Sequence, residues 1–183
     1  MSAKPYKTYS ASVLMQFTWS FAWRRSFTGV NIFCDDSYLA GGVNSGILIG
    51  PANDIVCTND CTIPNESIGN TQMYCSSYDV LQDWSYGSNS NYFNTSLVGN
   101  YSIHFADSAW VSLVQYGTPN SGGGNWEVRL RIDTRYRTDT KNINSSPISS
   151  MFPLVFLRKG IQFPLKISNY DSDNDVVRCR WAE

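Results

Sequence analysis

The sequence has few charged side chains and a single histidine. Charged residues make up 16% of its 183 residues, and the formal net charge at pH 7 is -1. Nucleic-acid binding usually requires a basic field, and binding of cationic partners is often served by an acidic tail. The composition provides neither, so it does not predict a partner that is recognised mainly by charge.

Long apolar runs are also missing. No stretch approaches the roughly 18 consecutive apolar residues of a membrane span, and the segment from Met1 to Tyr9 lacks the apolar centre of a signal peptide. We therefore expect a piece of a longer precursor. Apolar residues still make up 42% of the chain and aromatic residues 14%, which suffices to fill the core of one domain, or of one domain and part of another.

Catalytic motifs are the third absence. A Ser-His-Asp or Cys-His arrangement would have to use His104, which falls among the alternating apolar residues of an expected strand. Asp35 and Asp36 are adjacent, so their carboxylates point apart on an extended segment and do not make the spaced pair of a glycosidase. The sequence has no phosphate loop, dinucleotide fingerprint or metalloprotease motif. We predict that the protein is not an enzyme.

Five cysteines are present, and four of them, Cys34, Cys57, Cys61 and Cys75, fall in one stretch. A zinc site usually needs two short Cys-x-x-Cys pairs, and here only Cys57 and Cys61 are close. Disulfides fit better, since bridging a loop of tens of residues stabilises by roughly 3 to 4 kcal/mol, and they imply an oxidising compartment. Three pairings are possible, and we favour Cys34 with Cys75 and Cys57 with Cys61. Cys179 then has a mate beyond the last residue or is a buried free thiol.

Four Asn-x-Ser/Thr triplets support the same compartment, because such sequons are N-glycosylation acceptors in secreted proteins. Asn and Ser are abundant in this chain, so a single triplet can arise by chance, but clustering beside the cysteines strengthens the interpretation. The candidate glycosylation sites are Asn65, Asn94, Asn100 and Asn144.

Two segments show the period of two that is typical of half-buried strands. In residues 12 to 25 the alternate positions are Val13, Met15, Phe17, Trp19, Phe21 and Trp23. In residues 126 to 133 the apolar positions alternate with a charged face of Glu127, Arg129, Arg131 and Asp133. That charged face is expected to be solvated. We predict two long strands, each with one face in a core.

Shorter runs suggest further strands, at residues 46 to 49, 101 to 105 and 110 to 116, a hairpin of 154 to 157 with 161 to 167, and a strand at 177 to 181. No segment has convincing helical periodicity. The predicted fold is an all-β, antiparallel β-sandwich, immunoglobulin-like or jelly-roll-like, with a disulfide-stabilised loop region. We expect a sandwich domain over residues 1–143, and over 144–183 either the start of another β-module or the last strands of the same sandwich.

Several motifs carry a resemblance to a known group of proteins. They are Phe21-Ala22-Trp23-Arg24-Arg25, Cys34-Asp35-Asp36, Leu48-Ile49-Gly50, Ala109 to Leu113, Arg137 to Thr140, Asn144 to Pro147 and the ending from Asp171 to Trp181. They resemble the N-terminal region of large invertebrate extracellular proteins that combine such β-modules with EGF-like or von Willebrand-type domains. The similarity spans roughly Trp19 to Glu183. It implies an extracellular location and a β architecture, and it implies no activity.

The ending also resembles the start of a cadherin-like or immunoglobulin-like repeat, in which a linker precedes two strands, an Asp-rich loop and a strand bearing a Trp. This resemblance places a domain boundary at Asn144. Relatives carry a Cys just after the Arg-Lys-Gly turn, where this sequence has Ile161. The departure leaves the partner of Cys179 in doubt.

The Asp-rich loop is the best candidate for a metal site. Asp171, Asp173 and Asp175 alternate, so three carboxylates can turn toward one hard cation, and calcium is the expected ion. An EF-hand is excluded, because Val176 stands at the position of the required Gly and Ala182 at that of the bidentate Glu. The alternative is a solvated turn whose carboxylates cap backbone amides.

Two binding functions follow from these observations. The first is a non-enzymatic structural or adhesion module that mediates protein-protein assembly, by self-association or with neighbouring modules, at a cell surface or in extracellular matrix or fibres. The alternative is a calcium-dependent, lectin-type domain that binds glycans through Trp84, Tyr86 and Tyr92, in what reads as a Ser- and Asn-rich loop that also holds Phe93. Aromatic residues in such a loop often form a small core of their own instead.

Overall fold

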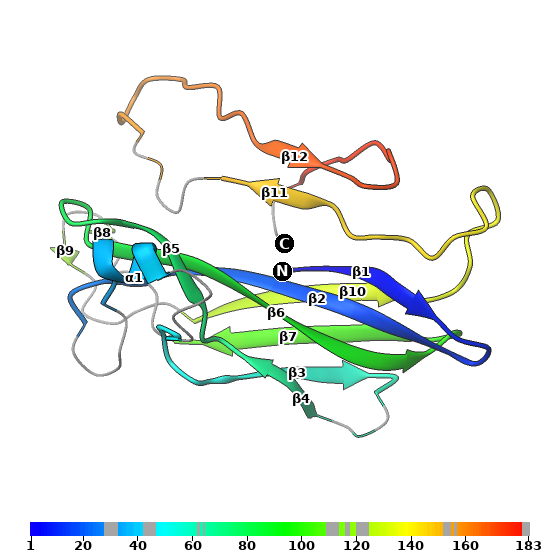
Figure 1. Cartoon of the computed structure of the whole chain (residues 1–183). Helices are drawn as coiled ribbons and strands as arrows, with labels where there is room; N and C mark the ends of the chain where they lie inside the picture. Colours follow the sequence, from blue (N-terminus) through cyan, green and yellow to red (C-terminus); the bar gives the residue numbers. More distant parts are fainter. Residues whose placement is uncertain are drawn as a thin grey trace.

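Two packed antiparallel sheets of four strands each make up most of the molecule. The computed structural model describes residues 1–27, 33–41, 47–61, 63, 65–108, 114–115, 118–119, 125–151, 155 and 157–180. The first sheet has the order β1(Ser2–Thr8), β2(Ser12–Arg24), β6(Trp84–Ser96), β5(Tyr74–Asp79). The second has the order β10(Trp126–Asp133), β7(Asn100–Asp107), β3(Asp54–Asn59), β4(Glu66–Asn70). Figure 1 shows one sheet lying over the other, which confirms the predicted all-β antiparallel sandwich.

The remaining elements are short. The helix α1(Asp36–Gly41) begins after Asp35, whose Oδ1 accepts the backbone N–H groups of Ser37 and Tyr38 and so acts as an N-cap. Two small two-stranded sheets complete the described chain. They pair β8(Val114–Gln115) with β9(Thr118–Pro119) and β11(Ile148–Ser150) with β12(Ser168–Tyr170).

The core is built on the inward row of β2. Val13, Met15 and Phe17 have no exposed area, and Trp19, Phe21 and Trp23 are also buried. Aromatic rings from β2 reach across to the second sheet, where the Phe21 ring lies edge-on, 5.4 Å from that of Phe105. Burying each such side chain contributes roughly 1.5 to 3 kcal/mol, so this row of six is the largest apolar contribution of any strand.

Strand β6 is polar in sequence, yet it pairs with β2 over thirteen residues, from Ser12↔Ser96 to Arg24↔Trp84. Gly87 is required where β6 passes β5, because a Cβ there would lie 2.1 Å from the Tyr74 carbonyl oxygen. Two inward asparagines of β6 donate to backbone carbonyls beside the second sheet, Asn91 to Ile68 at 2.8 Å and Asn89 to Gln72 at 3.2 Å. The polar side chains of β6 therefore satisfy backbone carbonyls of β4 and of the link between β4 and β5.

The strands predicted at residues 12 to 25, 101 to 105 and 126 to 133 are confirmed as β2, β7 and β10. The predicted strand at residues 161 to 167 is wrong, because the segment forms no ladder and exposes Ile161, Phe163 and Leu165. Residues 177 to 180 are likewise irregular. An alternating pattern produces a strand only where another strand supplies hydrogen bonds.

Other predictions meet the structure only in part. In the strand predicted at residues 46 to 49, Ile49 forms a single bridge to Met73, and Gly46 lies outside the described residues. In the strand predicted at residues 110 to 116, only Val114 and Gln115 lie among the described residues, and they form β8. Trp110 lies outside the described residues. The predicted Ser- and Asn-rich loop around Trp84 is wrong, since this segment is β6.

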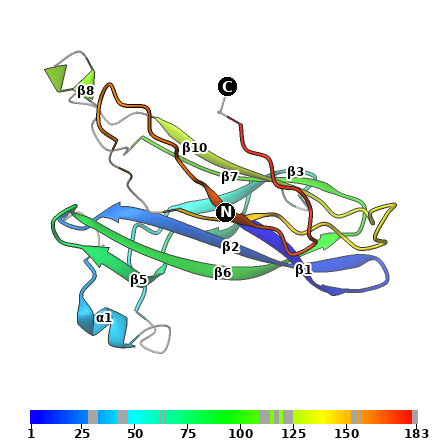
Figure 2. The same cartoon turned by 90° about the horizontal axis from the view of Figure 1, so that it is seen from above.

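The C-terminal segment after Ile143 lies along the open side of the sandwich next to β1, as Figures 1 and 2 show. The N–H of Ser146 donates to the Ala3 carbonyl at 2.8 Å, and Ser145 and Asp171 are buried. The expected division of the chain at Asn144 stays a prediction.

Two disulfides hold the region between Cys34 and Cys75. Cys34 bonds to Cys75 and ties the segment before α1 to β5, while Cys57 bonds to Cys61 at the end of β3. These are the two pairs that the cysteine spacing favoured. Cys179 is an exposed free thiol, so the alternative of a buried thiol is wrong.

The two disulfides are expected to differ in their contribution to stability. Their sequence separations are 41 and 4 residues. By loop-closure entropy, the double replacement C34A/C75A should lower the free energy of unfolding by about 4 kcal/mol, and C57A/C61A by about 2 kcal/mol. Urea denaturation of both variants measures this order. An equal loss, or a larger loss in C57A/C61A, would contradict it.

Candidate functional site

The Asp-rich loop brings three carboxylates together. Asp171, Asp173 and Asp175 each offer an oxygen within 4.8 Å of the others, and Asp171 is buried. The Oδ1 of Asp171 accepts the N–H of Asp173 at 2.9 Å and of Asp175 at 3.2 Å. The turn is therefore organised by a side chain that caps backbone amides, as Asp side chains commonly do.

The same loop is bonded to the sandwich through Arg137, on the segment that follows β10. The Arg137 guanidinium forms a two-pronged ion pair with Asp175, in which Nη2 lies 2.9 Å from Oδ1. It also donates to Asp139 at 2.7 Å and to the Asn144 side chain at 2.8 Å. We call Arg137, Asp139, Asn144 and Asp175 the Arg137 junction. It connects the C-terminal segment to the loop after β10.

A further bond closes the junction, since Asp173 Oδ2 accepts the N–H of the buried Ser145 at 2.6 Å. The Arg137 guanidinium, by hydrogen bonding, holds the pKa of Asp139 well below its usual range, and Asp139 in turn raises the pKa of Arg137. Arg137 and Asp139 are therefore both charged at neutral pH. The sequence pointed to the three aspartates but not to Arg137, which lies 38 residues from Asp175.

Two cations can pair with these carboxylates, a bound metal ion and the Arg137 guanidinium. Three clustered carboxylates are a donor set that suits a metal ion. Arg137 already supplies positive charge to Asp175, so a metal ion would compete with the guanidinium for that carboxylate. The residues fit a weak cation site better than a tight one.

All four sequon asparagines, Asn65, Asn94, Asn100 and Asn144, are exposed. Asn94 lies on β6, Asn100 begins β7, and Asn65 precedes β4 with a φ of 60°. Asn144 belongs to the Arg137 junction and donates its Nδ2 to the Ser145 carbonyl at 3.0 Å. Exposure is the property that a glycan acceptor requires.

Three of the four aromatic residues of β6 share its outward face. Trp84, Tyr86 and Tyr92 stand at even-numbered positions of the strand. The odd-numbered positions of β6 face the core, so these three side chains point away from it. The ring of Tyr6, on β1, lies edge-on to that of Tyr92 at 4.8 Å, and both are exposed. Phe93 points inward and lies 6.5 Å from Phe17. The sequence around Tyr6 is polar and gave no sign that this residue would lie beside Tyr92.

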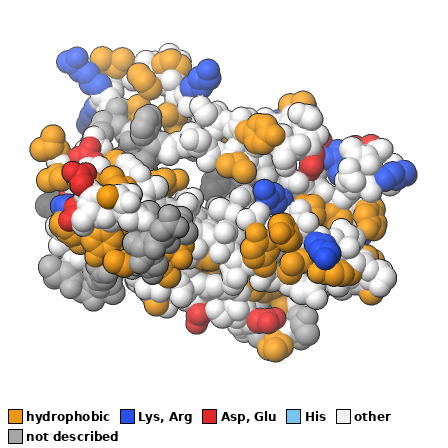
Figure 3. All heavy atoms as spheres, viewed as in Figure 1, with side chains coloured by type: hydrophobic (Ala, Val, Ile, Leu, Met, Phe, Trp, Pro, Cys, Tyr) orange, Lys and Arg blue, Asp and Glu red, His pale blue; other side chains and the backbone are white. Residues whose placement is uncertain are grey.

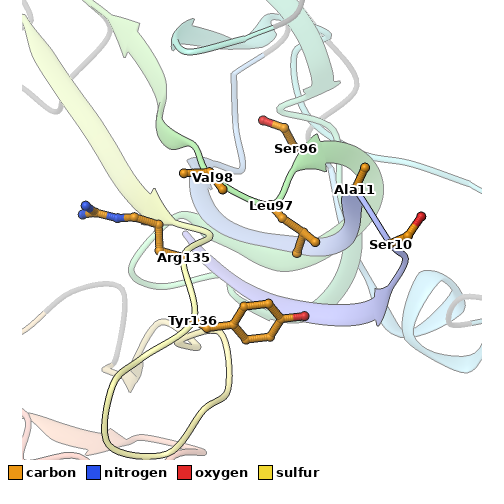
Figure 4. Close-up of a pocket in the computed structure, with 7 residues that line it drawn as sticks. All are labelled: Ser10, Ala11, Ser96, Leu97, Val98, Arg135 and Tyr136. Atoms are coloured by element: carbon orange, nitrogen blue, oxygen red, sulfur yellow. The ribbon is translucent and has the colours of Figure 1, made fainter.

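A shallow hollow of about 440 Å³ lies at one end of the sandwich. Figure 4 shows its walls, which come from the β1–β2 turn, the β6–β7 turn and the chain after β10. Val98 is 79% exposed there and Tyr136 is 52% exposed. Its lining is Ser10, Ala11, Ser96, Leu97, Val98, Arg135 and Tyr136. Three separate turns form it, so no local motif signals it.

The two aspartates considered for catalysis serve structural contacts. Asp35 caps α1, and Asp36 accepts the Tyr78 hydroxyl at 3.0 Å. His104 lies on β7, opposite Arg129 of β10 and Val56 of β3. It therefore occupies an outward strand position, as the alternation of β7 predicted.

The fold defines a class of protein, namely a β-sandwich module held by two disulfides. The chain matches the family model described as "Integrin beta-like protein A-E, N-terminal" over residues 4–135, and it belongs to this family. The match covers the strands of the two large sheets except for the first two residues of β1. No curated protein and no solved structure matches the chain.

The family match refines the resemblance found in the sequence. It supports an N-terminal module of cell-surface proteins and begins well before Trp19. The Asp171 to Trp181 ending lies outside the matched residues, so its likeness to a cadherin-like repeat stays a prediction. Among the helices that the structure describes, none has the length and apolar character of a membrane span.

Replacing Arg137 with Met should loosen the C-terminal segment. The pKa of Asp139 is depressed in the folded state, so its contribution to stability is present above the unfolded pKa of roughly 4 and is lost as the pH falls below it. We expect R137M to lower the Tm at pH 7, and the difference from the wild type to shrink as the pH falls below about 4. Thermal melts across this range measure both effects.

Arg135→Met is the matched control, because Arg135 pairs with Asp133 at the end of β10 and forms no ion pair or hydrogen bond with the described part of the C-terminal segment. Limited proteolysis should cut between residues 148 and 180 faster in R137M than in R135M. Equal cutting of the two variants would show that the Arg137 junction does not hold this segment.

Proposed function

We propose that the protein is a non-enzymatic extracellular module that mediates protein-protein assembly at a cell surface or in extracellular matrix. Membership of the integrin beta-like N-terminal family is the observation that carries the proposal. Two disulfides support an oxidising compartment, and four exposed sequons are compatible with glycosylation there.

The outer surfaces support contact with other proteins. The face of the first sheet carries neutral hydroxyl and amide groups across β2 and β6, among them Gln16, Thr18, Ser20, Ser88 and Ser90. Figure 3 shows hydrophobic side chains distributed among few charged ones on the face viewed there. Interfaces between proteins are commonly as mixed in polarity as this.

Assembly can be tested with the whole chain coupled to beads. Beads coated with the disulfide-intact protein should cluster with one another or bind to cells, and beads coated with the reduced, alkylated protein should do neither, because assembly requires the folded surface. Flow cytometry and light scattering measure both outcomes. Intact protein that binds neither itself nor cells would exclude the assembly function.

Calcium is the cation that we propose for Asp171, Asp173 and Asp175, bound weakly and in competition with Arg137. At a concentration of about ten times its Kd, an ion that binds only the folded state stabilises by about 1.4 kcal/mol, or a Tm rise of a few degrees. Its role would be to tighten the C-terminal segment against the sandwich.

Thermal melts in calcium and in chelator test the site. Asp173→Ala should abolish the calcium-induced rise in Tm, and Asp54→Ala, which removes an exposed carboxylate of β3, should leave it unchanged. Arg137→Met should enlarge the rise, because the competing guanidinium is gone. A wild-type melt that is the same with calcium and chelator would overturn the proposal.

Glycan binding is the second candidate function. The common outward face of Trp84, Tyr86 and Tyr92, with Tyr6 beside Tyr92, favours it because exposed aromatic rings can stack on sugars. A glycan array should then show binding that Tyr92→Ala weakens and Phe93→Ala, on the opposite face, affects only through stability. Silent arrays would leave protein assembly as the function.

A further inference from the structure

Strand β10 differs from the other three edge strands of the sandwich. The edges are β1 and β5 of the first sheet and β10 and β4 of the second. A register shift places one extra residue in each of β1, β4 and β5, namely Tyr6, Ile68 and Ser76. Strand β10 pairs with β7 without interruption from Trp126↔Asp107 to Asp133↔Asn100. It is therefore the regular edge.

The other edges are also covered by contacts that the structure describes. Ser146 donates to Ala3 on β1, where Pro5 lacks an N–H. The Cys34–Cys75 disulfide and α1 lie against β5, and the Asn91 side chain donates to Ile68 on β4. Bulges, prolines and such covers are the means by which sheets avoid pairing edge to edge. From Glu127 to Asp133, β10 has no bulge and no proline, and its outer edge forms no backbone hydrogen bond with another described segment.

The backbone groups of β10 divide between its two sides. The N–H of Thr134 donates to the Gly99 carbonyl at 3.0 Å and continues the β10–β7 register. Because hydrogen-bonded positions alternate in an antiparallel pair, even-numbered residues direct their N–H and C=O groups to β7. Glu127, Arg129 and Arg131 direct theirs to the outer edge, where another strand can bind.

The side chains of β10 also suit a second strand. Trp126, Val128 and Leu130 point toward the core but are only half-buried, as expected of inward positions at a sheet edge. On the outward face Glu127 and Arg129 form an exposed ion pair at 2.7 Å. An added strand would bury more of the apolar row and meet a charged row of both signs.

We propose that β10 pairs in antiparallel register with β10 of a second copy of this chain, so that Glu127 lies opposite the partner's Arg129. Val128 then lies at the two-fold axis, and Trp126 lies opposite the partner's Leu130. The two second sheets become one continuous eight-stranded sheet. This inference rests on the proposed assembly function and names its partner and surface.

Charge selects this register. Hydrogen bonding across the edge requires odd-numbered residues to face odd-numbered residues, so the copies can slide only in steps of two. One such step places Arg129 opposite itself, and the step in the other direction places Glu127 opposite itself. Like charges directly opposite are unfavourable, whereas the proposed register forms two opposite-charge pairs.

A contact limited to one strand pair is smaller than the roughly 800 Å² per partner of a stable interface. We therefore expect a weak dimer in solution that becomes strong when many copies are displayed on one surface, since multivalency multiplies weak contacts. This behaviour suits a module that works on a cell surface.

Charge-reversal variants of the full chain test the pairing. E127R alone places Arg opposite Arg across the dimer, and R129E alone places Glu opposite Glu, so each should weaken self-association about tenfold. A one-to-one mixture of E127R with R129E should restore it, because every facing pair is then of opposite sign. Each variant loses its own Glu127–Arg129 ion pair, so restoration by mixing reports contacts between copies.

The measurements are sedimentation equilibrium of each protein alone and mixed, and clustering of beads coated with each. R131E is the matched control, since Arg131 faces the neutral Asn125 of the partner, and it should behave as the wild type. Thermal melts check that all variants fold.

The outcomes distinguish a failure of the β10 pairing from a failure of the assembly function. Wild-type clustering that persists in E127R and R129E alone, or a mixture that fails to recover it, overturns the β10 pairing and leaves the assembly function standing. A loss in R131E as large as in E127R overturns the register and with it the proposal. Wild-type beads that neither cluster nor bind cells overturn the assembly function itself.

Discussion

The thirteen-residue pairing of β2 with β6 is the constraint on which the rest of the structure depends. It holds the apolar row of β2 in one plane, so that the rings of Phe21 and Trp23 meet the inward aromatic residues of β7 and β10. Without that plane the second sheet would have no surface to pack on, because β3 and β4 contribute few large apolar residues of their own. The polar strand β6 is therefore structural, and its outward face takes no part in the core.

The candidate functional surfaces lie where the packing of the two sheets ends. The outward face of β6 carries the aromatic residues, β10 is the regular open edge, and the Arg137 junction bonds the C-terminal segment to the loop after β10. None of these surfaces interrupts the core, so the charge and aromatic substitutions described above can alter binding while the fold persists. This separation is common in modules that act by assembly.

The sequence predicted the fold class and the strands β2, β7 and β10 because their apolar residues alternate clearly. It missed β6, whose Ser, Asn and Gly residues have low strand propensity, since pairing with β2 outweighs propensity there. It predicted a strand at residues 161 to 167 from alternation alone, and this segment forms no ladder with a described strand. For the candidate cation site, the spacing identified Asp171, Asp173 and Asp175, but Arg137 entered only through folding.

Patterns in the amino-acid sequence predict that this protein is all-β, that β2 has one face in a core, and that its cysteines suit disulfides. These properties follow from local spacing, which sets which face of a strand is apolar and which cysteines are near in the chain. Only the tertiary structure decided that a polar segment becomes a central strand, that Arg137 neutralises Asp175, and that β10 is the regular edge. Such features depend on which distant segments become neighbours, and the periodicity of a single segment does not contain that information.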